Sequence, residues 1–441
     1  MLYHSLNNDT NLVTFEQAVL NGISSDGHLY VPKYIPKLDP IFFRKITSFS
    51  QFNIATSVIK PYIGNTIPND VIYNIVKNTI NFPLPLKNIH DNIYALELFH
   101  GPTLAFKDIG AKFMAECLSY FCKKIENKIT VLVATSGDTG GAVARGFYNK
   151  IGIEVVILYP YNRISPLQEK QITSLGSNIF ALEINGNFDD CQNMVKKAFL
   201  DNEIKKKYTI TSANSINVAR WLPQMFYYFF SYKEFLNKFD TFKLNFSVPS
   251  GNFGNICAGM LAEKMGLPVK VFIASTNIND TIPRFIKSGN YSPTSVKKTI
   301  SNAMDISDPS NFPRILNFLY KKNINKLKKK LYSYKFTDKE VLNVIGKTWN
   351  KYKYVLDPHG AIGYLGIIKY LQNINNTSYT GIFLETAHPI KFIDNIPSSL
   401  RSTIFSKKET HKHNMLNLKN INKKISIKNN FNEFKDWLLN R

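Results

Sequence analysis

Residues 129–150 have the sequence ITVLVATSGDTGGAVARGFYNK, and this stretch decides the fold class of the chain. Its first residues, Ile129–Thr135, are apolar or β-branched, which predicts a short buried strand. Small residues then predict a helix over Gly140–Asn149, and Glu154–Tyr159 predicts the next strand. A strand, a helix and a second strand at this spacing are typical of a βαβ unit, so we expect a parallel sheet.

The same alternation extends along the chain in both directions. Ser165–Leu175 predicts a helix, Ile179–Ile184 a strand and Phe188–Leu200 another helix. Aromatic residues predict a long helix within 208–240. Further strands are predicted at Ile93–Leu98, Leu244–Val248, Val269–Ala274 and Tyr379–Leu384, and further helices at 108–122, Ile256–Met265 and Gly360–Leu371. The whole pattern indicates an α/β protein.

Two regions at the ends of this pattern differ from it. Pro83 and Pro85 punctuate the chain ahead of the first strand of the alternation, which places a domain boundary near residues 80–90. Residues 406–428 are rich in Lys and Asn with scattered apolar positions, which indicates an exposed C-terminal extension.

The composition limits the class of protein. With 441 residues, 44% of them hydrophobic, the chain can bury a large core in two or three domains. It carries 55 Lys and Arg against 32 Asp and Glu, a net charge of +23, which would suit a nucleic acid, a membrane or an anionic substrate. Because Lys, Asn and Ile are overused along the whole length and no Arg-rich segment stands out, the pattern favours compositional drift over a nucleic-acid partner.

The cysteines and the N-terminal residues indicate the compartment. Cys117, Cys122, Cys191 and Cys257 show no CxxC spacing, which argues against a zinc site and a disulfide framework. Residues 1–15 lack the apolar run of a signal peptide, and no apolar stretch is long enough to span a bilayer. We therefore expect a cytoplasmic protein with no membrane segment and no metal.

A lysine stands in an unusual place near the start of the alternation. The segment Glu97–Asp108 has the sequence ELFHGPTLAFKD, in which a strand ends, Gly-Pro turns the chain and a helix begins. Lys107 lies at that helix start and should be near a core, where a charged amine is costly. Burial would lower its pKa and free the neutral amine for Schiff-base chemistry. A surface lysine that extends its ammonium into water is the alternative.

Two glycine-rich turns follow predicted strands and precede predicted helices. They are Ala134–Gly141 (ATSGDTGG) and Val248–Asn255 (VPSGNFGN). Such turns offer backbone N–H groups to an anion, and the first one adds the hydroxyls of Thr135, Ser136 and Thr139. The first turn is neither a Walker loop nor a nucleophile elbow. For that turn, an ordinary connection between a strand and a helix remains the alternative.

Two further polar segments stand out, one ahead of the predicted aromatic helix and one at the end of the last predicted strand. Ser212–Arg220 (SANSINVAR) supplies amide and hydroxyl donors and the forked cation of Arg220, which suits a phosphate or carboxylate. A helix start with a solvated Arg would explain that segment equally well. Glu385–Pro389 (ETAHP) closes the last predicted strand, where open α/β sheets bind ligands. Together these segments suggest a ligand with more than one anionic group.

These segments, in this order, resemble the threonine synthase family of fold-type II pyridoxal-phosphate enzymes, in its longer branch with an N-terminal domain. The matching segments are Val13–Val19, Leu96–Asp108, Ala134–Gly140, Ile164–Lys170, Ser212–Arg220, Val248–Asn255, Asn277–Arg284, Ser301–Asp305 and Thr386–Pro389. The resemblance implies a tryptophan synthase β-like fold, with two α/β lobes around parallel sheets and a small N-terminal accessory domain. It implies that domain over residues 1–85, the catalytic region over 86–405 with its smaller lobe near 108–230, and a C-terminal extension over 406–441 packed on that region.

The resemblance also implies an activity. The chain would be a pyridoxal-phosphate-dependent lyase that converts O-phospho-L-homoserine and water to L-threonine and phosphate in threonine biosynthesis. It would act on this small molecule as a monomer or homodimer, with no nucleic acid and no membrane as partner.

Roles for individual residues follow from the resemblance alone. Lys107 would hold the cofactor as a Schiff base and carry protons during the reaction. The cofactor would contact Asp138, where relatives have Asn, and also Gly251, Asn252, Phe253, Gly254, Asn255 and Thr386. Thr135, Ser136 and Thr139 would bind the substrate carboxylate, and Asn214, Ser215 and Arg220 its phosphate. Glu385 stands where we expect a small residue.

Other proteins compete with this interpretation. A serine/threonine dehydratase or a cysteine synthase shares the lysine segment and the glycine-rich turns, but needs no second phosphate site such as the one around Arg220. A basic nucleic-acid-binding protein would need a basic face with stacking aromatics. An inactive relative would not be expected to keep Lys107 and both turns.

Overall fold

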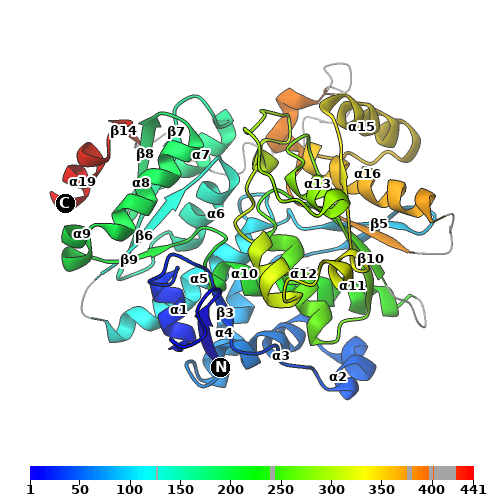
Figure 1. The fold of residues 1–441 in the computed structure, drawn as a ribbon, viewed down its shortest axis with the longest axis horizontal. Coiled ribbons are helices and arrows are strands. Elements are labelled where there is room, and N and C mark those ends of the chain that lie inside the picture. The colour runs from blue at the N-terminus through cyan, green and yellow to red at the C-terminus, as the bar shows by residue number, and fades with distance from the viewer. Residues whose placement is uncertain (126–127, 239–243, 375–379, 397–400, 402–423) are drawn as a thin grey trace.

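The computed structural model describes residues 1–441 except 126–127, 239–243, 375–379, 397–400 and 402–423. Two sheets lie side by side, each flanked by helices, and the first part of the chain packs below both of them in the view of Figure 1. The largest core cluster runs through the place where these parts meet.

The smaller lobe contains a five-stranded parallel sheet. Its strand order is β14(Lys424–Lys428), β8(Ile179–Asn185), β7(Ile153–Pro160), β6(Ile129–Ala134) and β9(Thr209–Ser212). Its helices are α5(Lys107–Phe121), α6(Asp138–Phe147), α7(Pro166–Thr173), α8(Phe188–Leu200) and α9(Asn202–Lys207). All six residues of β6 are buried, as expected for a central strand of a parallel sheet.

The larger lobe contains a six-stranded sheet. Its order is β12(Leu331–Lys335), β11(Val269–Thr276), β10(Leu244–Pro249), β13(Gly381–Glu385), β5(Ile93–Glu97) and β4(Leu86–His90), and only β4 runs antiparallel to its neighbour. Its helices are α10(Val218–Trp221), α11(Phe226–Leu236), α12(Gly254–Met265), α13(Thr281–Ser288), α14(Ile324–Lys328), α15(Asp338–Tyr352) and α16(Pro358–Asn373). Short helical turns are η2(Cys122–Lys124), η3(Leu222–Met225), η4(Asn302–Met304), η5(Arg314–Leu319) and η6(Pro389–Asn395).

The N-terminal part has its own small antiparallel sheet and a group of helices. The sheet order is β2(Val13–Thr14), β1(Leu2–Ser5) and β3(Tyr30–Pro32), and the helices are α1(Phe15–Asn21), α2(Pro40–Lys45), η1(Ile46–Ser48), α3(Gln51–Ile63) and α4(Asn69–Thr79). A buried arginine ties this part to the larger lobe. The Arg314 guanidinium donates to the carbonyls of Tyr30 (3.0 Å) and Ile216 (2.6 Å) and lies 4.3 Å from the Trp221 ring centroid.

Local sequence explains where helix α7 begins. At α7 the Ser165 hydroxyl accepts from the Gln168 N–H while the Gln168 side chain accepts from the Ser165 N–H, a reciprocal capping box. Pro166 occupies the first position of that helix, where no N–H is needed. Helix α7 begins where the sequence predicts it, because the capping signal is contained within four residues.

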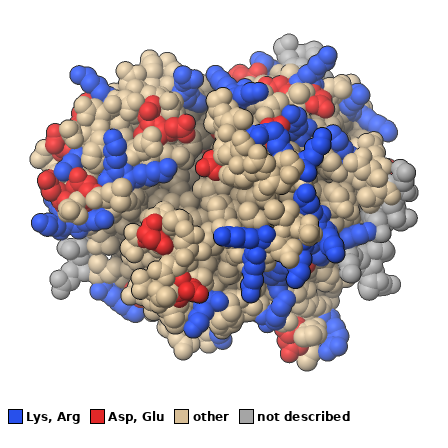
Figure 2. All heavy atoms as spheres, in the orientation of Figure 1, with Lys and Arg blue, Asp and Glu red and all other residues tan. Residues whose placement is uncertain are grey.

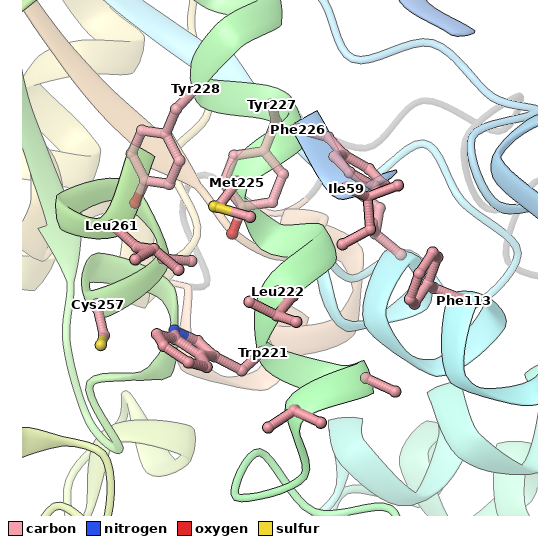
Figure 3. Close-up of a cluster of buried hydrophobic side chains, with 14 of the residues drawn as sticks. Ile59, Phe113, Trp221, Leu222, Met225, Phe226, Tyr227, Tyr228, Cys257 and Leu261 are labelled. Carbon is pink, nitrogen blue, oxygen red and sulfur yellow. The ribbon is translucent and has the colours of Figure 1, made fainter. Parts of the chain in front are cut away.

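The core between the lobes is built on the aromatic helical segment. Figure 3 shows the side chains that meet there: Ile59 of α3, Phe113 of α5, Trp221, Leu222, Met225, Phe226, Tyr227 and Tyr228 of the aromatic segment, and Cys257 and Leu261 of α12. All of them are fully buried. Close packing of this kind holds the elements that carry the polar residues of the site in fixed positions.

One element prediction is wrong in part. The long helix predicted within 208–240 begins only at Val218, because Thr209–Ser212 forms strand β9 at the sheet edge. Alternating β-branched residues fit a strand there. The helical stretch is also interrupted, since Pro223 lacks an N–H and lies in the 3₁₀ turn η3 between α10 and α11. Strands β1, β2, β3, β4, β12 and β14 were also not predicted.

Candidate active site

One pocket lies where strands of both lobes end. β6, β9, β10 and β13 all finish beside it, in agreement with the rule that α/β sheets bind ligands at the carboxyl ends of their strands. The structure brings together every residue that the sequence predicts for the site: Lys107, Thr135, Ser136, Asp138, Thr139, Asn214, Ser215, Arg220, Gly251, Asn252, Phe253, Gly254, Asn255 and Thr386.

Lys107 is the first residue of α5 and faces this pocket. Burial lowers the pKa of its amine to about 8, and the positive charges of Lys391 and Arg220 act in the same direction against Asp138. A good share of the amine is therefore neutral near physiological pH, as a nucleophilic lysine requires. The next residue, Asp108, accepts from the N–H (2.9 Å) and hydroxyl (2.6 Å) of Thr103, which fixes the start of the helix.

Asp138, at the start of α6, has a positive partner from the other lobe. Its Oδ1 lies 2.6 Å from Nζ of the fully buried Lys391 and accepts from the Gln168 side-chain amide at 2.9 Å. Burial alone would raise the pKa of Asp138, but the charges of Lys391 and Lys107 hold it well below its usual value. Asp138 is therefore ionised, and it offsets part of the positive charge around Lys107.

The first glycine-rich turn holds its shape through Thr135. The Thr135 hydroxyl accepts from the N–H groups of Gly137 (2.9 Å) and Gly140 (2.8 Å). Gly137 has a φ of 134°, which favours glycine. Within the described part of the chain, the hydroxyls of Ser136 and Thr139 make no hydrogen bond, so they remain available to a ligand in the pocket.

The second glycine-rich turn leads into α12. Phe253 adopts the left-handed conformation (φ 59°), and no side chain caps the helix N-terminus. A Cβ on Gly251 would lie 2.8 Å from Cα of Met304, so only glycine lets these two backbones approach. The Asn252 carboxamide is held on both sides, because its oxygen accepts from Ser310 and its nitrogen donates to Ser215.

Asn255, one residue into α12, presents an unpaired donor. Its side-chain oxygen accepts from the hydroxyls of Tyr227 and Tyr228, at 2.7 Å each. Its buried side-chain nitrogen has no partner among the described residues. Buried polar groups in folded proteins are nearly always paired, so this nitrogen indicates a missing acceptor.

The segment between β9 and α10 carries a buried cation. The Arg220 side chain is 3% exposed, its Nη1 donates to the Ala213 carbonyl, and its buried Nε has no partner among the described residues. Burial lowers its pKa to about 10, so it stays charged. Nearby, the Asn214 amide donates to the Ala134 carbonyl (2.8 Å), and the Ser215 hydroxyl accepts from Asn252 and Asn311.

Thr386 follows strand β13 and lies on the floor of the pocket. Its carbonyl accepts from the Phe106 N–H at 2.9 Å, and an isolated bridge between Ala105 and Ala387 joins the same two segments. The Thr386 residue is 6% exposed, and its hydroxyl is a neutral group. These contacts fix Thr386 relative to Lys107 across the lobe boundary.

Two residues of the site were missed from the sequence. His359 lines the pocket, and its Nδ1 lies 2.7 Å from Asp357 Oδ1, while its Nε2 accepts from the Ala303 N–H at 3.3 Å. Lys391 pairs with Asp138 from a turn remote in sequence. The sequence feature that could have identified His359 is its position two residues after Asp357, the N-cap of α16. No comparable sequence feature marks Lys391.

The residues present fit pyridoxal phosphate. Two places in the pocket can bind an anion. One is the N-terminus of α12, which no side chain caps and where Gly251 lets the backbone of Met304 come close. The other donors are the side-chain nitrogens of Asn255 and Arg220 that have no partner among the described residues. In the same pocket, Lys107 supplies an amine whose pKa burial lowers to about 8, and Thr386 supplies a neutral hydroxyl. In the described part of the chain, no group of three or more His, Cys, Asp or Glu could hold a metal ion.

The surface charge and the hydropathy of the helices bear on which partners the protein could bind. Figure 2 shows Lys and Arg spread over both lobes of the visible face and interspersed with Asp and Glu. Among the described helices, none is both long and apolar enough to cross a membrane.

Comparison with known proteins places the whole chain. Residues 75–384 match the family described as "Pyridoxal-phosphate dependent enzyme", and residues 2–80 match "Threonine synthase N terminus". The chain is 44% identical to the threonine synthase of Haemophilus influenzae, over 95% of this chain and 96% of that protein. It is 40% identical to the threonine synthase of Escherichia coli, over 93% of each.

Solved structures agree with these matches. The crystal structure of threonine synthase from Escherichia coli matches with a TM-score of 0.89 and 37% identity, covering 100% of both chains. The threonine synthase structure from yeast matches with a TM-score of 0.90 and 33% identity, covering 99% of this chain and 98% of that one. The predicted fold, two α/β lobes around parallel sheets with an N-terminal domain, is confirmed.

Proposed function

Because the chain belongs to the threonine synthase family of pyridoxal-phosphate-dependent enzymes, we propose that it converts O-phospho-L-homoserine and water to L-threonine and phosphate. The family membership rests on matches that span nearly the whole chain and on structural agreement at TM-scores near 0.9. The substrate and the residue roles below are the parts that we propose.

The observation that carries the proposed substrate is a second anion site beside the cofactor cradle. The cofactor phosphate needs one cradle, for which the turn at 251–255 is suited. The buried Arg220 and the Ser215 hydroxyl then remain as donors for another phosphate, and they lie in the same pocket as Lys107. An amino-acid substrate with its own phosphate group explains why a forked cation is buried there.

Binding roles can be given to the remaining donors. Arg220 and Ser215 hold the substrate phosphate and leave it aligned as the departing group, while Asn214 keeps their segment fixed to the end of β6. Ser136 and Thr139 bind the substrate carboxylate, and Thr135 shapes their turn. Two anchored ends orient the substrate carbon chain past the Lys107 amine, which is how positioning lowers a barrier.

Lys107 holds the cofactor and moves protons. When bound, pyridoxal phosphate would supply an electron sink for a carbanion at the substrate carbon that bears the amino group. An amine with a pKa of about 8 can both accept and return protons at the substrate carbons near neutral pH. The Thr386 hydroxyl would serve as a hydrogen-bond partner for the ring nitrogen, and Asp138 for the ring hydroxyl.

The test is to mix the purified protein with O-phospho-L-homoserine and to measure threonine and free phosphate together. Equal amounts of both products are expected, together with the visible absorbance of bound cofactor. The Lys107→Ala variant is the control, and it should be folded, colourless and inactive, because Lys107 is the only lysine among the described residues that line the pocket. Turnover by that variant contradicts the assignment of Lys107.

A dehydratase or a cysteine synthase would give a different pattern. Either protein would show cofactor absorbance but no phosphate release from O-phospho-L-homoserine. Activity on serine, threonine or O-acetylserine in the same assay would then identify the other reaction and refute the proposed substrate.

A further inference from the structure

Glu385 is the last residue of β13 and directly precedes Thr386 of the site. It is completely buried, its carboxyl group lies beside that of Asp357, and among the residues that the structure describes neither of its oxygens makes a hydrogen bond of good geometry. A buried carboxylate without donors is strongly unfavourable, whereas the protonated acid is tolerated and can itself donate. The geometry therefore calls for a proton on Glu385.

The position of the carboxyl group is set by a glycine. A Cβ on Gly360, in the first turn of α16, would collide with the Glu385 carboxyl. The carboxyl group thus lies against the start of that helix, whose free N–H groups could in principle stabilise an anion. They are already used: the N–H groups of His359 (2.9 Å) and Gly360 (3.0 Å) both donate to the Asp357 carboxylate.

The other neighbours of Glu385 are acidic. In the sheet, Glu385 is paired with Glu97 of β5, and Glu97 keeps its own partners, Lys87 (3.2 Å) and His100 (2.7 Å). The hydroxyl of Tyr354 also donates to Glu97, at 3.0 Å. Burial, and next the negative charge of Asp357, raise the pKa of Glu385 well above its usual value. Glu97 and Asp357 therefore keep the charges, and Glu385 is the group that carries a proton.

Asp357, whose carboxyl group interacts directly with that of Glu385, connects this acid to the pocket. Because the Ala303 N–H donates to His359 Nε2 at 3.3 Å, the neutral ring must carry its proton on Nδ1, which donates to Asp357 at 2.7 Å. The Ala303–Met304 backbone in turn packs on Gly251 of the second glycine-rich turn. A chain of contacts thus leads from Glu385 through Asp357 and His359 to the turn that cradles the cofactor.

We propose that Glu385 is a neutral carboxylic acid in the folded protein, that it donates its proton to Asp357, and that it is a positioning residue for His359 and the Ala303–Met304 backbone. Its protonation state does not depend on the proposed function, whereas its positioning role rests on that function. The two parts are therefore tested with different measurements.

The protonation state is tested by infrared spectroscopy of the cofactor-loaded protein at pH 8. The band of a protonated carboxylic acid should be present in the wild type and absent in Glu385→Gln. Asp108 and Asp305, whose pKa values burial raises to about 6, are ionised at that pH and do not contribute. Glu203→Gln, at a side chain that is 70% exposed, is the matched control and should leave the band unchanged. A band that persists in Glu385→Gln overturns the proposal.

Thermal unfolding of the same loaded proteins gives an independent test. An acid whose pKa is raised on folding binds a proton in the folded state, so stability falls as pH rises between the ordinary Glu value and the raised one. Glu385→Gln removes this loss, so its melting temperature should gain on the wild type by about 2 °C per pH unit from pH 6 to 8. If the difference in melting temperature between Glu385→Gln and the wild type stays constant or shrinks as pH rises, Glu385 is ionised and the proposal is overturned.

The positioning role is tested by comparing two variants in the assay of the proposed function. Glu385→Gln keeps a neutral donor of the same shape and should retain kcat within about twofold. Glu385→Ala leaves Asp357 without that donor and should lower kcat about tenfold, the value of one buried hydrogen bond. Equal activity of Glu385→Ala and the wild type overturns the positioning role. If no protein turns over O-phospho-L-homoserine, the proposed function fails, and the infrared and thermal results still decide the protonation state.

Discussion

At the scale of single residues, the site holds more positive than negative charge. Arg220 and Lys391 are buried and Lys107 is partly exposed, and these three cations face two carboxylates, Asp138 and Asp108. Each cation is costly to bury alone. Two phosphate-bearing ligands in the same pocket would balance the excess, which explains why unpaired donors are kept there.

The pH dependence of cofactor capture follows from Lys107. Only the neutral amine attacks the aldehyde, so the rate at which cofactor-free protein captures pyridoxal phosphate should rise with pH and level off above about 8, where the amine loses its proton. An unperturbed lysine would put that midpoint near ~10.4. Stopped-flow absorbance over pH 6–10 measures the midpoint, and a value near the unperturbed one contradicts the effect of burial.

Substitution of Arg220 should separate substrate binding from cofactor binding. Arg220→Ala removes a charge-assisted hydrogen bond worth about 1.5–3 kcal/mol, so KM for O-phospho-L-homoserine should rise about tenfold or more. The visible absorbance of bound cofactor should stay. Arg284→Ala is the matched control, because that arginine pairs with Asp280 outside the pocket and should leave KM unchanged. Loss of cofactor absorbance in Arg220→Ala would assign Arg220 to the cofactor instead.

Single residues also mark the limit of sequence-based inference. Lys107, the two glycine-rich turns and Arg220 stand in short motifs, so their presence in one pocket could be predicted. The engagement of the Thr135 hydroxyl by its own turn, and the proton on Glu385, depend on distances to groups elsewhere in the chain. No local pattern encodes those distances.

At the scale of elements, the turn η6 joins the two lobes. Its Lys391 reaches across to Asp138 of α6 at 2.6 Å and donates to the Thr103 carbonyl at 2.9 Å. The pair is fully buried, so water cannot replace either partner. This contact fixes the smaller lobe relative to the floor of the pocket.

Breaking this pair should cost stability. Lys391→Met leaves Asp138 charged in the interior without its ion-pair partner, and the free energy of unfolding should fall by about 3–5 kcal/mol. Urea unfolding followed by fluorescence measures the change. The double variant Lys391→Met with Asp138→Asn removes the stranded charge and should recover part of the loss. Equal losses in the single and double variants would show that packing, and not charge, explains the effect.

Element prediction succeeded where the periodicity was local. The strands at Ile129, Ile179 and Leu244 begin at the predicted residues, because runs of buried apolar residues define them. β9 was hidden by the aromatic helix after it, and β12 alternates tyrosine with polar residues, a weak strand signal. Their membership of a sheet depends on neighbours far away in the sequence.

At the scale of the whole molecule, the chain's two ends are both built into the fold. The N-terminal part is held by Arg314, and the C-terminal residues supply edge strand β14 and helix α19(Phe431–Leu439). Phe434 and Leu438 of α19 are buried in the same core cluster as residues of β7 and β8. The domain limits of 1–85, 86–405 and 406–441, the cytoplasmic location and the oligomeric state, monomer or homodimer, stay predictions.

Removal of the C-terminal element should expose an aggregation-prone edge. Deletion of residues 424–441 uncovers the backbone of β8 and the apolar surface that Phe434 and Leu438 cover. We expect a lower melting temperature and rising light scattering at 37 °C. Ile425→Thr, at an exposed position of β14, is the control and should behave like the wild type. A truncated protein that stays monodisperse and equally stable would show that β8 needs no cover.

The place of β14 has a consequence for how the protein is made. Strand β8 leaves the ribosome long before its outer partner, because β14 lies far downstream in the sequence. The lobe that carries Lys107 therefore cannot complete its sheet until Lys424–Lys428 is translated, and β8 stays open to wrong partners through that time. A nascent chain stalled before Lys424 should need chaperones, and the cofactor should load only after β14 has been added.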